Sequence, residues 1–145
     1  MTQVDFYILN KQSLQDQYLF ACRVLEKAQQ QGNRVLIQTD NENKAKELDQ
    51  LIWAYNPNSF LPHVLLNNTA ALQHAPIAIG WQQDPAHHDD IIINLSHEIP
   101  SFYSRFKRYI GIVVQEDQVL AQTRRHFKFL KDRGYQINTH DLRIR

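Results

Sequence analysis

Three basic residues near the C-terminal end of the chain form the pattern with the most direct chemical meaning. Arg124, Lys128 and Lys131 are spaced by four and three residues, so a helix would place them along one stripe, with Phe127 beside them. Like charges at this spacing repel weakly, so the stripe destabilises its own helix unless an anion binds there. The stripe is therefore either a solvated face, whose aliphatic stems cover apolar surface, or a pocket for an anionic ligand.

Two classes of ligand fit the second interpretation. An acidic peptide with an apolar end would place its carboxylates on the cations and its end against Phe127. Single-stranded nucleic acid also suits aromatic rings that lie next to cations. Direct nucleic-acid binding is the weaker expectation, because the stripe is short and the rest of the surface is acidic. Residues 122–145 hold seven basic and two acidic residues, a net +5, which leaves a net −4 for residues 1–121.

A second unusual segment spans residues 53–63, where a helical pattern breaks in a loop that contains two prolines. Large apolar side chains gather at the helix end and in this loop, namely Trp53, Tyr55, Phe60 and Leu61. Such side chains either close the core from outside or form an apolar contact patch for a partner protein. The pattern of residues leaves both interpretations open.

Signals for catalysis or for a metal are weak. His87 and His88 precede two aspartates, but adjacent residues rarely face one centre, so this segment is interpreted as a solvated turn. Cys22, the one cysteine, lies on the inner side of a predicted helix and is expected to be a buried, inert thiol. No GxSxG motif marks a nucleophile. We therefore predict no catalytic residue and no metal site.

A nucleotide cofactor is also not expected. The predicted turn from the first strand to the first helix spans residues 9–13 and contains no glycine, although a pyrophosphate needs glycines to approach the backbone there. The chain has four glycines, and none belongs to a Walker-type loop.

The elements that must position these residues alternate between strand and helix. Apolar runs predict strands at residues 4–9, 34–38, 76–81, 91–95, 109–114 and 135–138. Apolar spacing of three and four predicts helices between Ser13 and Gly32, from Asp40 or Asn41 to residue 53, over residues 100–108, and from Asp117 to Gly134. The segment after residue 53 is predicted to be irregular. This alternation predicts an open, mostly parallel, doubly wound α/β sheet with helices on both faces.

The inner side of the last helix is predicted from the same spacing. Leu120, Thr123, Phe127 and Leu130 are expected to share it, with Val119 and Phe129 near its edges.

Length and composition indicate a globular protein. The 145 residues suit one domain, residues 1–145, and 43% hydrophobic with 21% charged residues is ordinary for this class. The longest apolar runs are far shorter than a membrane span requires, and the single cysteine is typical of a cytoplasmic protein. No targeting segment is expected.

Several of these motifs together resemble the chi subunit family of bacterial DNA polymerase III. The resemblance rests on residues 6–9, 34–37, 48–53, the SFLPH run at 59–63, the strand at 89–95 and the basic helix that ends in Gly134 and Tyr135. It implies a non-catalytic adaptor with a nucleotide-binding-like fold that holds no nucleotide. It also implies two partners, the psi subunit and the acidic, Phe-terminated C-terminal tail of single-stranded DNA-binding protein.

The resemblance further implies which residues meet each partner. The tail site would comprise Arg124, Phe127, Lys128 and Lys131, and the psi surface would include Trp53 and Phe60. Phe127 stands where the family often has tyrosine, so a hydroxyl is absent. Lys131 stands where arginine is common, which weakens bidentate capture of a carboxylate.

Two other functions remain as alternatives. One is a small α/β enzyme with a crevice at the carboxyl ends of its strands, although no convincing acid–base pair is found in the sequence. The other is a protein that binds single-stranded DNA directly.

Overall fold

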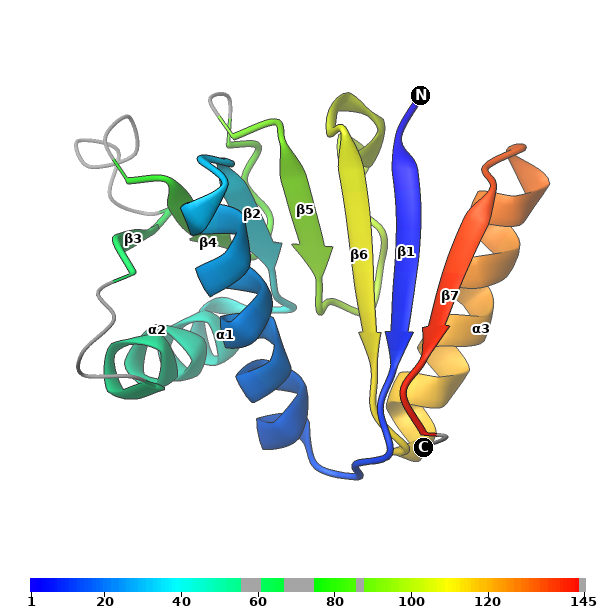
Figure 1. Ribbon diagram of the computed structural model, residues 1–145, viewed down its shortest axis with the longest axis horizontal. Coiled ribbons are helices and arrows are strands. Elements are labelled where there is room, and N and C mark those ends of the chain that lie inside the picture. Colours follow the sequence, from blue (N-terminus) through cyan, green and yellow to red (C-terminus); the bar gives the residue numbers. More distant parts are fainter. Residues whose placement is uncertain (56–60, 67–74, 86–87, 144–145) are drawn as a thin grey trace.

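The structure, a computed structural model, describes residues 1–55, 61–66, 75–85 and 88–143. A seven-stranded sheet has the order β3-β4-β2-β5-β6-β1-β7, and every pair of neighbouring strands is parallel (Figure 1). The strands are β1 (Gln3–Ile8), β2 (Val35–Gln38), β3 (His63–Leu65), β4 (Ile77–Gly80), β5 (Ile91–Asn94), β6 (Arg108–Val113) and β7 (Ile137–Asp141). The predicted open α/β sheet is confirmed, and its described strands are parallel throughout.

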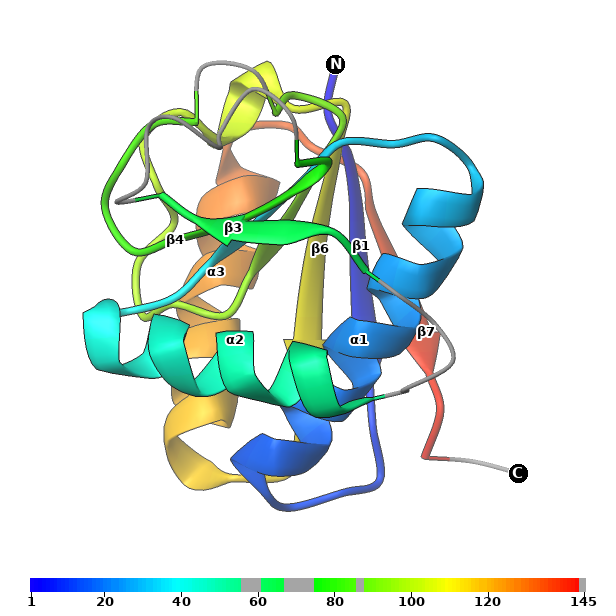
Figure 2. The ribbon, with the colours of Figure 1, turned by 90° about the vertical axis from the view of Figure 1, so that its left-hand side faces the viewer.

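The α-helices of the described residues are α1 (Leu14–Gln30), α2 (Glu42–Tyr55) and α3 (Asp117–Asp132). Helices α1 and α3 lie on opposite faces of the sheet, which confirms helices on both faces (Figures 1 and 2). Helix α2 packs against α1 and against β3 and β4. On the face that carries α1, the described helices leave β1 and β7 uncovered (Figure 1).

The central strands form the core. Every residue of β2, β4 and β5 is buried, as expected for strands that are covered on both faces. Ile92 and Ile93 are fully buried. Each such side chain stabilises the fold by about 1.5–3 kcal/mol relative to an exposed position.

The boundaries of α1 follow the sequence signals. Ser13 caps its start, because the backbone N–H of Asp16 donates to Ser13 Oγ over 3.1 Å. Gly32 follows its end with a φ of +77°, a conformation that glycine adopts without strain.

The other two caps refine the prediction. Helix α2 is capped by Asn41, whose Oδ1 accepts from the backbone N–H of Lys44 over 2.9 Å. Helix α3 is capped by Glu116 and not by Asp117. The backbone of Glu116 is extended, and its side-chain Oε2 accepts a hydrogen bond from the backbone N–H of Val119 over 2.9 Å.

Three predicted elements need correction. The helix expected over residues 100–108 is only a 3₁₀ turn at Tyr103–Arg105, because Arg108 already pairs with β1 and β5 as the first residue of β6. The segment after residue 53 is not wholly irregular, since α2 continues to Tyr55 and β3 pairs with β4. The last strand lies later in the chain than predicted, at Ile137–Asp141, where pairing with β1 decides its position.

In the described part of the chain, no helix combines the length and the apolar character needed to cross a membrane.

Candidate functional site

Helix α3 is rotated relative to the predicted orientation. Val119, His126 and Leu130 are its buried residues, whereas Phe127 is 36% exposed. The prediction that Leu120, Thr123, Phe127 and Leu130 share the inner side is therefore wrong for Phe127. Phe127 lies at the edge of the buried face, where its ring can contact both the sheet and a ligand.

His126, which is buried on α3, was not among the predicted site residues. Its ring Nε2 lies 2.7 Å from the carbonyl oxygen of His97, so a neutral ring donates this hydrogen bond. Burial lowers the pKa of His126, and the adjacent Arg125 acts in the same direction. The only available signal was its place one turn before Leu130 on the helix.

A hollow of about 230 Å³ lies beside Phe127, between α3 and the strands β1, β6 and β7. Phe6 of β1 lines it, with a ring centroid 6.1 Å from that of Phe127. The apolar part of the lining also includes Ile8, Val113 and Leu120. This hollow, called the α3 hollow below, is apolar inside and borders solvent along α3.

Two arginines border the α3 hollow. Arg124 comes from α3 and makes no ion pair with any described residue, whereas Arg143 follows β7 and pairs with Asp141 at 2.7 Å. The hydrogen bonds from Arg143 lower the pKa of Asp141 to about 2. Arg143 was absent from the predicted site, and its position depends on the pairing of β7 with β1.

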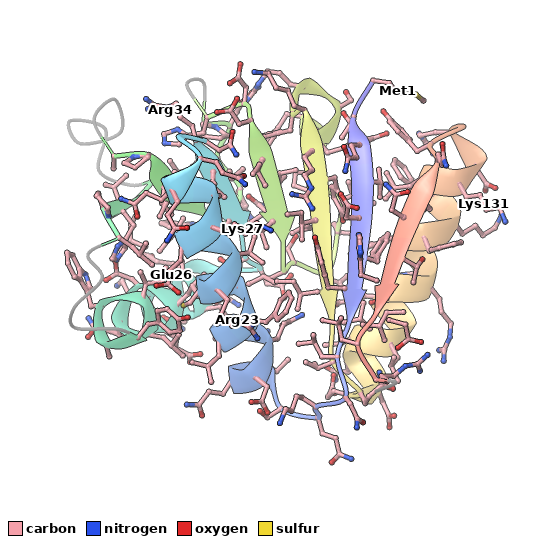
Figure 3. All side chains as sticks on the ribbon, viewed as in Figure 1. Met1, Arg23, Glu26, Lys27, Arg34 and Lys131 are labelled. Atoms are coloured by element: carbon pink, nitrogen blue, oxygen red, sulfur yellow. The ribbon has the colours of Figure 1, made fainter. Side chains whose placement is uncertain are left out.

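The two lysines of the predicted stripe, Lys128 and Lys131, have different surroundings. Lys131 is exposed at the outer side of α3, and its Nζ lies 5.9 Å from the centroid of the Phe127 ring (Figure 3). Lys128 instead pairs with Asp132 at 2.8 Å, and this hydrogen bond raises the pKa of Lys128. The structure thus places Arg124, Phe127 and Lys131 around one surface and directs Lys128 to its own neighbour.

The second predicted surface is described only in part. Trp53 on α2 is 52% exposed, and its ring centroid lies 4.5 Å from that of His63. His63 is held by its own contacts, since its Nε2 lies 3.0 Å from Asp49 Oδ1. Phe60 lies outside the described residues, so its position relative to Trp53 stays a prediction.

Two of the other candidate residues, Cys22 and His88, are buried. Cys22 is fully buried, and burial raises the pKa of its thiol to about 12, as expected for an inert cysteine. His88 is buried and its Nε2 lies 2.8 Å from the carbonyl oxygen of Ala75, so the solvated-turn interpretation is wrong for this residue. His87 lies outside the described residues. Among residues that the structure describes, no group of three His, Cys, Asp or Glu side chains is placed to hold a metal.

Comparison with solved structures shows the fold. Domain 2 of the DEAD-box helicase Mss116p, solved with an RNA duplex, superposes on 94% of this chain with a TM-score of 0.65. The chain spans 63% of that chain, and the two are 9% identical.

Comparison with protein families and curated proteins shows relatedness in sequence. Residues 1–138 match the family model described as DNA polymerase III chi subunit, HolC. The DNA polymerase III subunit chi of Pseudomonas aeruginosa is 35% identical over 98% of both chains. That of Haemophilus influenzae is 32% identical over 94% of this chain and 95% of its own, and that of Escherichia coli is 28% identical over 96% and 97%. These matches span nearly the whole chain, and the chain therefore belongs to the family of DNA polymerase III chi subunits.

Proposed function

We propose that this chain is a non-catalytic adaptor of the polymerase III assembly. In this proposal it binds the psi subunit of the clamp loader through one surface and the C-terminal tail of single-stranded DNA-binding protein through another. The observation that carries the tail site is the α3 hollow, an apolar cavity bordered by Arg124 and Arg143. Such a cavity suits an apolar side chain that is adjacent to carboxylates.

The size and charge of the α3 hollow support a peptide end as its occupant. At about 230 Å³ it is smaller than the roughly 300–1,000 Å³ of typical small-molecule sites, which suits a single aromatic side chain. The ring of Phe127 would contact that side chain edge-on or in an offset stack. Arg124 makes no ion pair within the described residues, so a carboxylate can bind it without displacing a partner.

The cations of the proposed tail site are expected to contribute unequally to peptide binding. Arg124 borders the hollow and Lys131 lies over the Phe127 ring, so both would meet carboxylates near the apolar end. Lys128 would first have to leave Asp132, so its contribution would be smaller. The pairs are exposed to solvent, so we expect a dissociation constant of about 1 μM, which weakens as salt is added.

The psi surface is proposed on Trp53 and Phe60. An exposed tryptophan on a helix is a typical anchor for a protein partner, because it buries a large area at low entropic cost. The contact of its ring with His63 fixes the side chain before binding.

Titration calorimetry with a short acidic peptide that ends in phenylalanine tests the tail site. Arg124→Ala should weaken binding by about fivefold or more, because a charge-assisted hydrogen bond is lost, and Lys128→Ala should weaken it less. Lys107→Ala serves as the control, since Lys107 is exposed, pairs with Asp90 and does not line the hollow. Equal affinities in the parent and in Arg124→Ala would refute the assignment.

A second titration tests the psi surface. Phe60→Ala should weaken binding of a psi subunit and leave the affinity for the acidic peptide unchanged. Loss of both affinities together would indicate unfolding, and circular dichroism of the variant distinguishes that case. An unchanged psi affinity would contradict the proposed surface.

A further inference from the structure

The face of the sheet opposite α3 carries a second set of cations and rings. Side chains alternate along a strand, so Tyr7 of β1 points away from the face on which Phe6 meets Phe127. In the parallel register Tyr7 is level with His140 of β7, and the Tyr7 ring also packs against Phe20 of α1 at a centroid distance of 5.4 Å.

The rings of Tyr7 and His140 form a stack, and hydrogen bonds to Arg108 and Asp5 hold the two side chains in place. The centroids of Tyr7 and His140 are 4.5 Å apart and their planes differ by only 12°. Buried Asp5 accepts hydrogen bonds from His140 Nε2 and from Arg108 Nε, each over 2.8 Å, and Arg108 also donates to the Tyr7 hydroxyl over 2.7 Å. The His140 side chain is still 42% exposed, so the stack can accept a further flat group.

A groove with cationic walls runs beside this stack. It consists of two hollows of about 260 and 520 Å³ that share Phe20 and Arg23 of α1, and it is called the α1 groove below. Its lining contains five cations, namely Lys11, Arg23, Lys27, Arg108 and Arg143. Asp16 is the one acidic residue among the described residues that line it.

Three of the five cations, Lys11, Arg23 and Lys27, make no ion pair with any described residue. Arg23 and Lys27 are exposed and lie one turn apart on α1, about 6 Å along the helix axis (Figure 3). Glu26, the acidic residue between them, instead accepts a hydrogen bond from the Tyr55 hydroxyl over 2.8 Å. The guanidinium of Arg23 lies over the ring of Phe20, at 5.6 Å from its centroid.

We propose that the α1 groove binds single-stranded DNA. The unpaired cations would meet successive phosphates, and a base would extend the stack of Tyr7 and His140. An acidic peptide would satisfy the cations but would leave the exposed ring stack without a flat partner. The expectation of little direct nucleic-acid binding rested on the shortness of the basic stripe and on the negative net charge of residues 1–121. A negative average charge is compatible with a local basic surface, because the fold gathers cations from the loop after β1, from α1, from β6 and from the end of β7 into one groove.

Fluorescence anisotropy with a labelled oligothymidylate of about 20 nucleotides tests the proposal on the full chain. The double variant Arg23→Glu/Lys27→Glu should weaken binding by about tenfold or more at low salt. Loss of two phosphate contacts should also reduce the slope of log K against log salt by about 1.4. The matched control is Lys44→Glu/Lys46→Glu, which makes the same change of charge on α2, where both lysines already have acidic partners.

A third variant separates base stacking from charge. His140→Gln keeps an N–H donor for Asp5 and removes the ring, and it should weaken oligothymidylate binding by about fivefold or more. Circular dichroism and the affinity for the acidic Phe-ended peptide should be unchanged in Arg23→Glu/Lys27→Glu, because neither Arg23 nor Lys27 lines the α3 hollow. This control makes failure of the α1 groove distinguishable from failure of the proposed tail site.

Three outcomes would overturn the proposal. The first is no change of anisotropy with the parent chain at protein concentrations of about 100 μM, near the weak end of non-specific binding. The second is equal loss in the α1 and α2 double variants, which would indicate only a general effect of charge. The third is loss of acidic-peptide binding in Arg23→Glu/Lys27→Glu with oligothymidylate binding intact, which would make the groove a peptide site.

Discussion

Replacing Gly111 with alanine should close the α3 hollow from below. Gly111 of β6 pairs with Phe6, and the Phe6 ring lies directly over it. A Cβ at residue 111 would lie 2.5 Å from Cδ1 and Cε1 of that ring, against about 3.5–4.0 Å for a favourable contact. The ring must therefore move by roughly 1 Å. Tyr109 and Phe127 pack near it at centroid distances of 6.2 and 6.1 Å, so the free space beside it is the hollow.

The expected change in the free energy of unfolding of Gly111→Ala combines two opposing effects. Overpacking of a well-packed core costs about 1–3 kcal/mol. Loss of the extra backbone freedom of glycine in the unfolded chain returns about 0.4–1 kcal/mol. The middle of each range leaves a net loss of stability of about 1–2 kcal/mol. For a chain of this size that corresponds to a melting temperature lowered by roughly 2–8 °C.

Two assays on the same variant check this reasoning. Thermal unfolding followed by circular dichroism gives the change of stability, and calorimetry with the acidic Phe-ended peptide gives the change of affinity. Both should fall in Gly111→Ala. The added variant Phe6→Leu should restore the stability, because a smaller side chain leaves room for the new methyl group.

Gly80→Ala is the matched control. A Cβ at residue 80 would lie 2.7 Å from Cδ1 of Leu66, the flexible end of a side chain that does not line the hollow. This variant should lose less stability and keep the parent affinity for the peptide. If Gly111→Ala melts with the parent and binds the peptide equally well, the packing of Phe6 on Gly111 does not shape the hollow, and the reasoning fails.

Three further predictions concern buried polar groups. Asp5→Asn should lower the free energy of unfolding by about 2 kcal/mol in urea titrations, because Arg108 and His140 lose their carboxylate partner; an unchanged midpoint would contradict the network. Burial lowers the pKa of His126 in the folded chain. As the pH falls, the unfolded chain therefore takes up this proton before the folded chain does. The free energy of unfolding should fall as the pH drops below about 6.5. Urea titrations at neutral and at acidic pH measure this loss of stability, and the loss should be smaller in His126→Leu than in the parent. An equal loss in both chains would argue against a role of His126. The Cys22 thiol, with a pKa of about 12, should resist a chromogenic disulfide reagent in the native chain and react promptly in denaturant, whereas rapid native reaction would show that it is accessible.

Local pattern was sufficient for elements whose signals are strong and close in sequence. The run at residues 91–95 predicted β5 because a strand that is covered on both faces needs continuous aliphatic residues. Ser13 predicted the start of α1 because its hydroxyl reaches a backbone N–H three residues later. β3 was missed because three residues carry too little periodicity to be distinguished from a loop.

The candidate site was predicted less completely, for reasons of geometry. Arg124, Phe127 and Lys131 could be grouped from spacing alone, because all three lie on one helix. The rotation of α3 could not, since apolar residues border its inner face on both sides and several orientations satisfy the same spacing. His126 and Phe127 are neighbours in sequence, yet packing buries the first and places the second at the edge.

The sequence by itself determined the alternation of strands and helices, the basic character of α3 and the family to which its motifs point. These properties depend on the types of neighbouring residues and on periods of two and 3.6 residues. Only the tertiary structure decided that β7 pairs with β1, which brings Arg143 to the α3 hollow and His140 onto Tyr7. The same structure gathered the cations of the α1 groove from four separate segments. The physical reason is that strand order and register follow from burial of the whole core, which no local stretch of sequence contains.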